Sequence, residues 1–82
     1  MPGNFVYILR CADNTFYTGW TTDLERRLNQ HLCGKASKYT RSRLPVVCVY
    51  TAMFASQQQA MAEEYRIKQL SRSQKDELVA GS

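Results

Sequence analysis

Short runs rich in β-branched and aromatic residues occur at three places along the chain, and each run predicts a β-strand. They cover residues 5–11, 16–20 and 46–53. The polar segment 12–15 has the composition of a turn, so we expect the first two strands to pair as an antiparallel hairpin. Pro45 stands directly before the third run.

Helical patterns occupy the segments between and after these strands. Thr22 and Glu25 have the spacing of a capping box, which predicts a helix from residue 23 to about residue 33. Gly34 is placed to end that helix. Residues 35–44 form a polar, basic loop with room for a short helical turn.

Two further helices are expected near the end of the chain. Ser56 can cap a long helix that runs through Leu70, and Ser71 or Ser73 can cap a short one that reaches about Ala80. The order β-β-α-β-α-α predicts an α+β fold, in which helices pack against a three-stranded antiparallel sheet. With 82 residues, the whole chain 1–82 is expected to form a single domain.

Side-chain alternation separates the two faces of the hairpin. In the first strand, Tyr7 points to the side opposite Val6 and Ile8. In the second strand, Tyr17 and Gly19 share one face. We therefore expect Tyr7 and Tyr17 to lie near each other on adjacent strands. Tyrosines in such positions most often only pack the sheet.

The first helix distinguishes two adjacent arginines. Arg27 and His31 are i, i+4 neighbours at the edge of the apolar stripe, whereas Arg26 points toward solvent. Arg27 is thus placed to reach a groove over the sheet, or else to lie along its edge. The apolar stripe itself consists of Leu24, Leu28 and Leu32.

The long helix carries a carboxylate among its apolar positions. Glu64 falls within the stripe, and a carboxylate there is costly unless it is paired or binds a metal. Glu63 lies near the same stripe, so the periodicity alone does not choose between the two glutamates. The apolar side is formed by Ala60, Met61, Ile67 and Leu70.

Composition and charge narrow the class of protein. The hydrophobic fraction is 44%, and the longest apolar run, residues 46–50, is far too short to cross a membrane. The first residues lack the features of a signal peptide, and three cysteines with no metal-binding spacing suit reduced thiols. We therefore expect a cytoplasmic protein.

The net charge of +4 is modest, but its placement is informative. One basic cluster lies in the loop before the third strand and a second near the end of the long helix. Such clusters suit a polyanion such as nucleic acid, although solvated basic surfaces have the same composition. Their members are Lys35, Lys38, Arg41 and Arg43 with Tyr39 among them, and Arg66, Lys68, Arg72 and Lys75.

Several of these segments resemble the GIY-YIG nuclease superfamily. Residues 5–7, Phe-Val-Tyr, and 17–19, Tyr-Thr-Gly, resemble the two half-motifs that give the family its name. Residues 22–31 resemble its second block, while residues 34–40 and 60–70 are similar to the small, stand-alone bacterial branch. The resemblance extends from about residue 5 to residue 79. Five blocks in the right order are far more specific than any one of them.

The resemblance implies a set of site residues. It assigns the catalytic arginine to Arg27 and the metal-binding glutamate to Glu64, which decides against Glu63. Trp20 departs from the pattern, because some relatives have a lysine there. The remaining matches are the motif tyrosines Tyr7 and Tyr17, the motif glycine Gly19, a histidine near the site, His31, and the branch-specific Lys38 and Tyr39.

The implied chemistry is metal-dependent phosphodiester hydrolysis. One Mg²⁺ (or Mn²⁺) on Glu64 suits an ion that keeps most of its waters. Arg27 would hold phosphate oxygens, and Tyr17, or alternatively Tyr7, would position the attacking water and take its proton. A tyrosine of ordinary pKa is a poor base, so His31 as a cation, or the metal, would have to lower that pKa.

The expected partner is DNA, held by its backbone, with branched or flap structures among the expected targets; RNA stays open as an alternative substrate. Binding to phosphates is independent of sequence, so a protein partner for targeting is also conceivable. Two other classes stay open: a DNA-binding module with an idle nuclease site, and a docking domain. The residues assigned to DNA binding are Lys35, Lys38, Tyr39, Arg41 and Arg43.

Overall fold

The predicted order of elements is confirmed, with one short helix added in the basic loop. The structure, a computed structural model, describes residues 3–81. Its elements are β1 (Asn4–Arg10), β2 (Phe16–Thr21), α1 (Leu24–Leu32), α2 (Lys38–Arg41), β3 (Val47–Phe54), α3 (Gln57–Lys68) and α4 (Arg72–Ala80). The four-residue α2 forms within the loop where a helical turn was expected.

The three strands form one antiparallel sheet in the order β2-β1-β3, so β1 is the central strand. In the β1–β2 ladder, Tyr7 pairs with Gly19 and Leu9 pairs with Tyr17. Tyr7 and Tyr17 are therefore diagonal neighbours on one face, as the alternation predicted. The α+β fold class expected from the sequence is confirmed.

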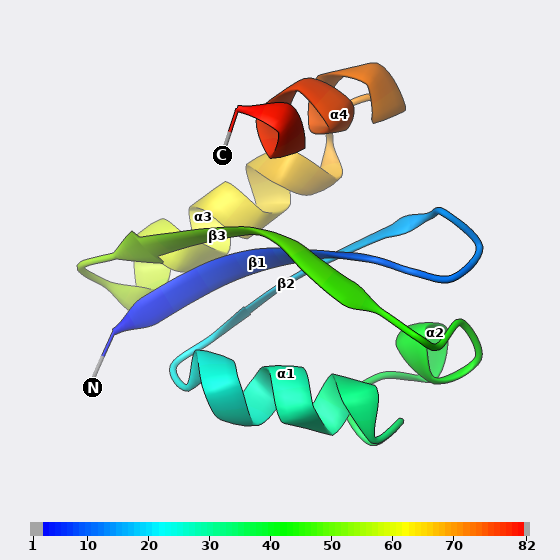
Figure 1. The fold of residues 1–82 in the computed structure, drawn as a ribbon. Coiled ribbons are helices and arrows are strands. Elements are labelled where there is room, and N and C mark those ends of the chain that lie inside the picture. Colours follow the sequence, from blue (N-terminus) through cyan, green and yellow to red (C-terminus); the bar gives the residue numbers. More distant parts are fainter. Residues whose placement is uncertain (1–2, 82) are drawn as a thin grey trace.

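Helices cover both faces of the sheet (Figure 1). On one face, Val6 and Ile8 pack with Ala60 and Ile67 of α3, and α4 closes this side. On the other face, a second apolar cluster is built around Tyr7, Leu9, Cys11 and Val46, with Leu24 and Leu28 of α1 packed against it. The central strand thus separates two small cores.

The start of the first helix differs from the prediction. The N-cap is Asp23, not Thr22: the Asp23 carboxylate accepts from the backbone N–H of Arg26 at 3.1 Å. Thr21 contributes as well, because its hydroxyl accepts from the Asp23 N–H at 3.1 Å. With the cap one residue later, Glu25 no longer stands at the third helical position, and the predicted capping box does not form.

The later helix starts agree with the sequence. Ser56 caps α3 and Ser71, one of the two expected serines, caps α4. Both form complete capping boxes, with Gln59 and Gln74 as the reciprocal partners. Gly34 follows α1 with a φ of +74°, which explains why a glycine ends that helix.

Two expected core residues face solvent instead. Leu32 is 54% exposed, whereas His31, predicted at the edge of the stripe, is fully buried. The last turn of α1 directs His31 toward Tyr7 of the sheet and Thr40 of α2, so Leu32, the last residue of the helix, points to solvent. Met61 is 45% exposed, since α3 turns Ala60 and Ile67 to the sheet and Met61 points about 100° away from Ala60.

Two further observations concern the chain as a whole. All three cysteines, Cys11, Cys33 and Cys48, are free thiols, as expected. Within residues 3–81, no helix combines the length and the apolar character that crossing a membrane requires.

Candidate active site

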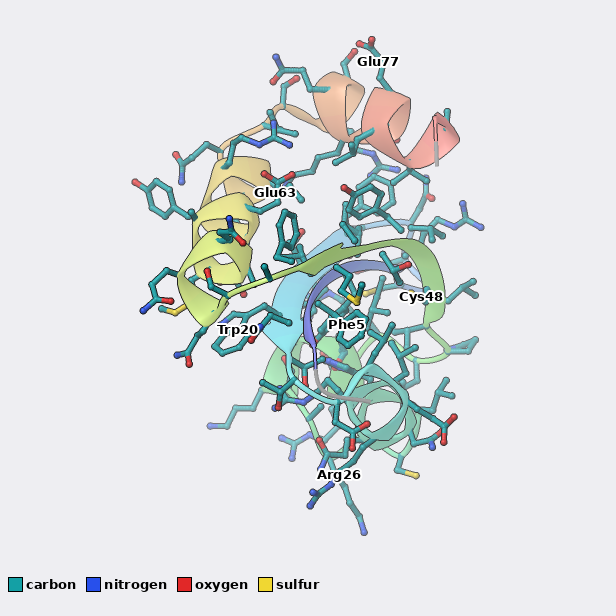
Figure 2. The ribbon with its side chains drawn as sticks, turned by 90° about the vertical axis from the view of Figure 1, so that its left-hand side faces the viewer. Phe5, Trp20, Arg26, Cys48, Glu63 and Glu77 are labelled. Atoms are coloured by element: carbon teal, nitrogen blue, oxygen red, sulfur yellow. The ribbon has the colours of Figure 1, made fainter. Side chains whose placement is uncertain are left out.

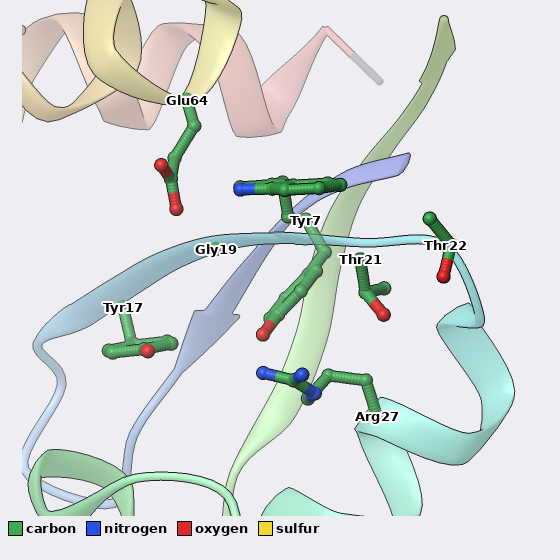
Figure 3. A pocket seen from close by; sticks show the side chains of 8 residues that line it. Tyr7, Tyr17, Gly19, Thr21, Thr22, Arg27 and Glu64 are labelled. Atoms are coloured by element: carbon green, nitrogen blue, oxygen red, sulfur yellow. The ribbon is translucent and has the colours of Figure 1, made fainter. Parts of the chain in front are cut away.

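A pocket of about 380 Å³ lies beside the edge strand β2. Four elements contribute a polar side chain to it: Tyr7 from β1, Tyr17 from β2, Arg27 from α1 and Glu64 from α3 (Figure 3). Tyr7 and Glu64, 57 positions apart in the chain, thus meet at one place. The rest of the lining is Gly19, Trp20, Thr21 and Thr22.

Gly19 makes room for the Tyr7 ring. A Cβ atom at position 19 would lie 2.5 Å from the Tyr7 hydroxyl oxygen and 2.7 Å from the ring carbon that bears it. Because the two residues are cross-strand partners, the ring lies directly over the glycine backbone. The second half-motif therefore has a glycine at this position because a side chain would collide with the Tyr7 ring.

Tyr7 has no exposed surface, and its hydroxyl is 2.8 Å from Nε2 of His31. Burial and the neighbouring Tyr17 raise the pKa of Tyr7 to about 12, although the charge and hydrogen bonding of Arg27 oppose the shift. Figure 3 shows the Tyr7 hydroxyl pointing toward the Arg27 guanidinium. At neutral pH, Tyr7 is a protonated phenol.

His31 is equally buried, and its Nδ1 is 2.9 Å from the hydroxyl of Thr40. Burial, together with the positive charge of Arg27, lowers the pKa of His31 below its ordinary value of 6.5. His31 is therefore neutral at pH 7. The expectation that it acts as a cation and lowers the pKa of a tyrosine is wrong, because a second positive charge beside Arg27 in a buried site is unfavourable.

The structure separates the neighbouring residues that the sequence offered as alternatives. Arg27 lines the pocket and is half-buried, whereas Arg26 points away from the sheet (Figure 2). Glu64 lines the pocket, whereas Glu63 forms a two-pronged ion pair with Arg66, at 2.8 and 2.6 Å. The geometry thus favours the same arginine and glutamate as the resemblance.

Tyr17 is positioned by aromatic contacts. Its ring lies edge-on to His31, with centroids 5.2 Å apart, and is stacked on Tyr39 of α2 at 5.9 Å. The Arg43 guanidinium covers the Tyr39 ring at 3.8 Å. Arg43 in turn donates to the carboxylate of Asp13, in the β1–β2 turn, at 2.9 Å. A row of stacked groups therefore connects the hairpin turn to the pocket.

The basic residues assigned to DNA binding do not share one environment. Lys35, Lys38 and Arg41 are exposed, and within residues 3–81 none of the three forms an ion pair. Arg43 is bound to Asp13 and to the backbone carbonyl of Tyr39. From the second cluster, Arg66, Lys68 and Arg72 are paired with Glu63, Glu64 and Asp76, respectively.

Sequence reasoning missed two residues that contact the site. Thr40 is a fully buried partner of His31, and an uncharged residue in a basic loop gave no signal of that role. Lys68 lies 3.5 Å from the Glu64 carboxylate. Its position four residues after Glu64 on a helix was a signal that the sequence contained.

The donors at the pocket suit a metal that needs few protein ligands. Across residues 3–81 there is no cluster of three or more histidine, cysteine or carboxylate side chains that could hold a metal ion. Among the described residues that line the pocket, Glu64 is the only carboxylate. Mg²⁺ is commonly held by one or two carboxylates together with waters and substrate phosphate. A closed site of the zinc type does not fit these residues.

Comparison with known proteins agrees with this geometry. The GIY-YIG catalytic domain matches residues 3–77. A UPF0213 protein of Halobacterium salinarum is 53% identical over 89% of this chain and 95% of its own length. A UPF0213 protein of Staphylococcus haemolyticus is 49% identical over 96% of both chains.

Solved structures of similar proteins share the fold. The solution NMR structure of a UPF0213 protein from Bacillus halodurans is 49% identical, has a TM-score of 0.63, and is matched over 95% of this chain and 83% of that one. A second NMR structure, of a protein from E. faecalis, is 36% identical with a TM-score of 0.67, over 99% and 86% of the two chains. The chain therefore belongs to the GIY-YIG family, whose domains are generally endonucleases.

Proposed function

We propose that this protein hydrolyses phosphodiester bonds in DNA with the help of one bound Mg²⁺ or Mn²⁺ ion, in the repair or processing of DNA. The observation that carries the proposal is the convergence of Tyr7, Tyr17, Arg27 and Glu64, from four elements, on one pocket. A pocket that only filled a gap in the packing would not need a cation, a carboxylate and two phenols at its wall.

Arg27 is the group suited to hold the phosphate. A planar guanidinium donates two parallel hydrogen bonds to phosphate oxygens and stays charged at any working pH. The Tyr7 hydroxyl and the His31 ring behind it hold this side of the pocket in place. Negative charge that develops on the phosphorus oxygens would thus meet a cation that is already positioned.

The two tyrosines have different surroundings, and we assign them different roles. The Tyr7 hydroxyl is committed to His31 and Arg27, and a pKa of about 12 makes it a weak acid that keeps its proton. Tyr17 is half-buried, faces the pocket and is placed by ring contacts. We therefore assign to Tyr17 the positioning of the attacking water. As a phenolate, with its own proton lost to solvent, it would also accept the proton of that water.

Glu64 is the residue that would hold the metal, and its side chain is 21% exposed toward the pocket wall. A bound divalent ion supplies charge that polarises the phosphate and assists the leaving oxygen. Lys68, 3.5 Å from the same carboxylate, keeps Glu64 paired when no ion is bound. Binding of an ion there requires Glu64 to separate from Lys68, whose own side chain is 51% exposed and can turn into solvent.

DNA would reach the pocket across α2. Tyr39 on α2 is stacked on Tyr17, so the exposed cations Lys38 and Arg41 on the same short helix adjoin the site. Contacts of this kind are made with phosphates and do not depend on the base sequence. We therefore propose recognition of a DNA structure, such as a flap or branch, or targeting by a protein partner.

The test is cleavage of supercoiled plasmid and of a labelled flap DNA, with Mg²⁺ and with chelator. Arg27→Ala and Glu64→Ala are compared with Arg26→Ala and Glu63→Ala, which remove the adjacent residue of the same type. Cleavage that needs the metal, disappears in the first pair and persists in the second supports the proposal.

Two outcomes would contradict it. A folded wild-type protein that binds DNA and cuts neither substrate would be a DNA-binding module with an idle site. A folded protein that neither cuts nor binds DNA would favour a docking domain. If Tyr17→Phe retains the full rate while Tyr7→Phe loses it, the assignment of the base to Tyr17 is wrong.

A further inference from the structure

We propose that Thr40 is a positioning residue: it sets the direction of a buried hydrogen-bond chain and thereby fixes the tautomer of His31. The chain runs from Arg27 through Tyr7, His31 and Thr40 to the main-chain carbonyl of Ser37. It ends on the backbone just before α2, outside the pocket.

Three consecutive hydrogen bonds define the chain. The Tyr7 hydroxyl lies 2.8 Å from His31 Nε2, and His31 Nδ1 lies 2.9 Å from Thr40 Oγ1. The Thr40 hydroxyl donates to the Ser37 carbonyl oxygen at 3.3 Å. Tyr7, His31 and Thr40 all have 0% exposed surface, so water does not compete for these bonds.

The groups at the two ends of the chain, the Ser37 carbonyl and the Arg27 guanidinium, determine which atom donates in each hydrogen bond. A carbonyl oxygen can only accept, so the Thr40 hydroxyl hydrogen is used on Ser37 and Thr40 Oγ1 accepts from Nδ1–H of His31. Nε2 of the neutral ring then has a lone pair, which accepts the Tyr7 hydroxyl hydrogen. The Tyr7 oxygen is left with its lone pairs toward Arg27, a side chain that can only donate.

The opposite direction leaves a group without a partner. If Nε2 carried the proton, it would donate to the Tyr7 oxygen, and the Tyr7 hydrogen would need another acceptor. Arg27 cannot supply one, and within residues 3–81 His31 is the only hydrogen-bond acceptor placed at the Tyr7 hydroxyl. A buried hydroxyl without a hydrogen-bond partner is unfavourable. The first direction satisfies every donor.

The direction matters for the pocket because it decides what the Tyr7 oxygen presents to Arg27. In the proposed arrangement, lone pairs face the guanidinium and help to orient it. In the reversed arrangement, a hydroxyl hydrogen would face a cation and push it away. This step rests on the proposed role of Arg27 as the phosphate-binding group; the tautomer itself does not.

The tautomer can be measured directly, since the sequence contains one histidine. ¹⁵N NMR of the full chain labelled at histidine distinguishes a protonated Nδ1 from a protonated Nε2 at pH 7.5. We expect Nδ1–H in the wild type. Thr40→Val keeps the branched shape but removes the acceptor, so we expect a shift toward Nε2–H, and Thr40→Ser should restore Nδ1–H. A wild-type Nε2–H tautomer, or an unchanged tautomer in folded Thr40→Val, would overturn the proposal.

Cleavage kinetics supply the second readout. If DNA is cut, Thr40→Val should lower kcat by about 10- to 100-fold, the range known for losing the hydrogen-bond partner behind a metal ligand, with little change in KM. Thr40→Ser should recover most of the rate, and Thr51→Val, at an exposed position on β3, should keep it. If the wild type cuts no DNA, the nuclease proposal fails, while the NMR measurement still decides the role of Thr40.

Discussion

At the scale of single residues, the Tyr7 ring occupies the space that any side chain at position 19 would need. We expect Gly19→Ala to lower the free energy of unfolding by about 1–3 kcal/mol, the range for forced overpacking, because the ring is also bound to His31. Urea unfolding followed by tyrosine and tryptophan fluorescence measures this. Gly81→Ala is the control, since its Cβ would meet its nearest atom at an ordinary 3.5 Å. Equal stability of the two variants would contradict the steric reason.

A second prediction at this scale concerns pH. The pKa of His31 is lowered in the folded protein from an ordinary value of 6.5. Below pH 6.5 the unfolded chain therefore takes up a proton that the folded chain does not, and stability falls until the pH passes the folded pKa. Above pH 6.5 both states are neutral at this residue, and it contributes no pH dependence.

The slope from His31 is at most about 1.4 kcal/mol per pH unit. Urea titrations at pH 7.5, 6.5 and 5.5 measure it, and His31→Gln should flatten the profile. The carboxyl groups of Asp13 and Glu63 also have lowered pKa values, from 3.8 and 4.5, but they act at lower pH. Constant or rising stability toward pH 5.5 would show that His31 is not a buried neutral group.

The positions of charged site residues could be predicted from the sequence better than those of uncharged site residues. Helical periodicity placed Arg27 toward the sheet, because an apolar stripe fixes which way each turn faces. It did not choose Glu64 over Glu63, since both lie close to the same stripe. The role of Thr40 could not be predicted from the sequence. It depends on a contact with His31 across the α1–α2 connection, and no local pattern encodes that contact.

At the scale of elements, the helix caps decide where the site residues stand. Ser56 fixes the first turn of α3, the helix that carries Glu64. We expect Ser56→Ala to cost about 1 kcal/mol, which lowers the unfolding temperature of a domain of this size by about 4–8 °C. Ser73→Ala is the matched control, an exposed serine inside α4 that caps no helix. Calorimetry compares the two, and equal melting temperatures would contradict the role of the cap.

The elements also show what local sequence cannot specify. Strand and helix positions were predicted to within a few residues, since periodicity and caps are local signals. The start of α1 was misplaced by one residue because Thr22 and Asp23 are both good caps, and the contact of Thr21 with the Asp23 backbone selects between them. The burial of His31 in place of Leu32 depends on where α2 and the sheet leave room.

At the scale of the whole molecule, the protein carries a net charge of +4. Some of its basic side chains form ion pairs with carboxylates, whereas others within residues 3–81 form none. If DNA is held by phosphate contacts, only the unpaired cations should release counterions. We expect Lys35→Ala, Lys38→Ala and Arg41→Ala each to reduce the salt slope of duplex binding by about 0.9. Fluorescence anisotropy in chelator, at several salt concentrations, measures the slope.

The control for the salt slope is Arg66→Ala, because Arg66 is held by Glu63 at 2.6 Å. Its slope should stay close to that of the wild type. A uniform decrease in all four variants would mean that DNA contacts the molecule over both basic clusters. No decrease in any variant would place the DNA-binding surface away from the loop between α1 and β3.

The division of the site between the two sides of the sheet has a practical consequence. Tyr7, Tyr17 and Arg27 all precede the turn between β3 and α3, and Glu64 follows it. A chain divided at that turn yields one fragment with the two tyrosines and the arginine of the pocket and another with the carboxylate. Neither fragment holds all four of these pocket residues, and the apolar contacts of Val6 and Ile8 with α3 are what would bring the two together. If the proposed activity holds, the fold is a starting point for a split enzyme whose turnover reports the association of two fused partners.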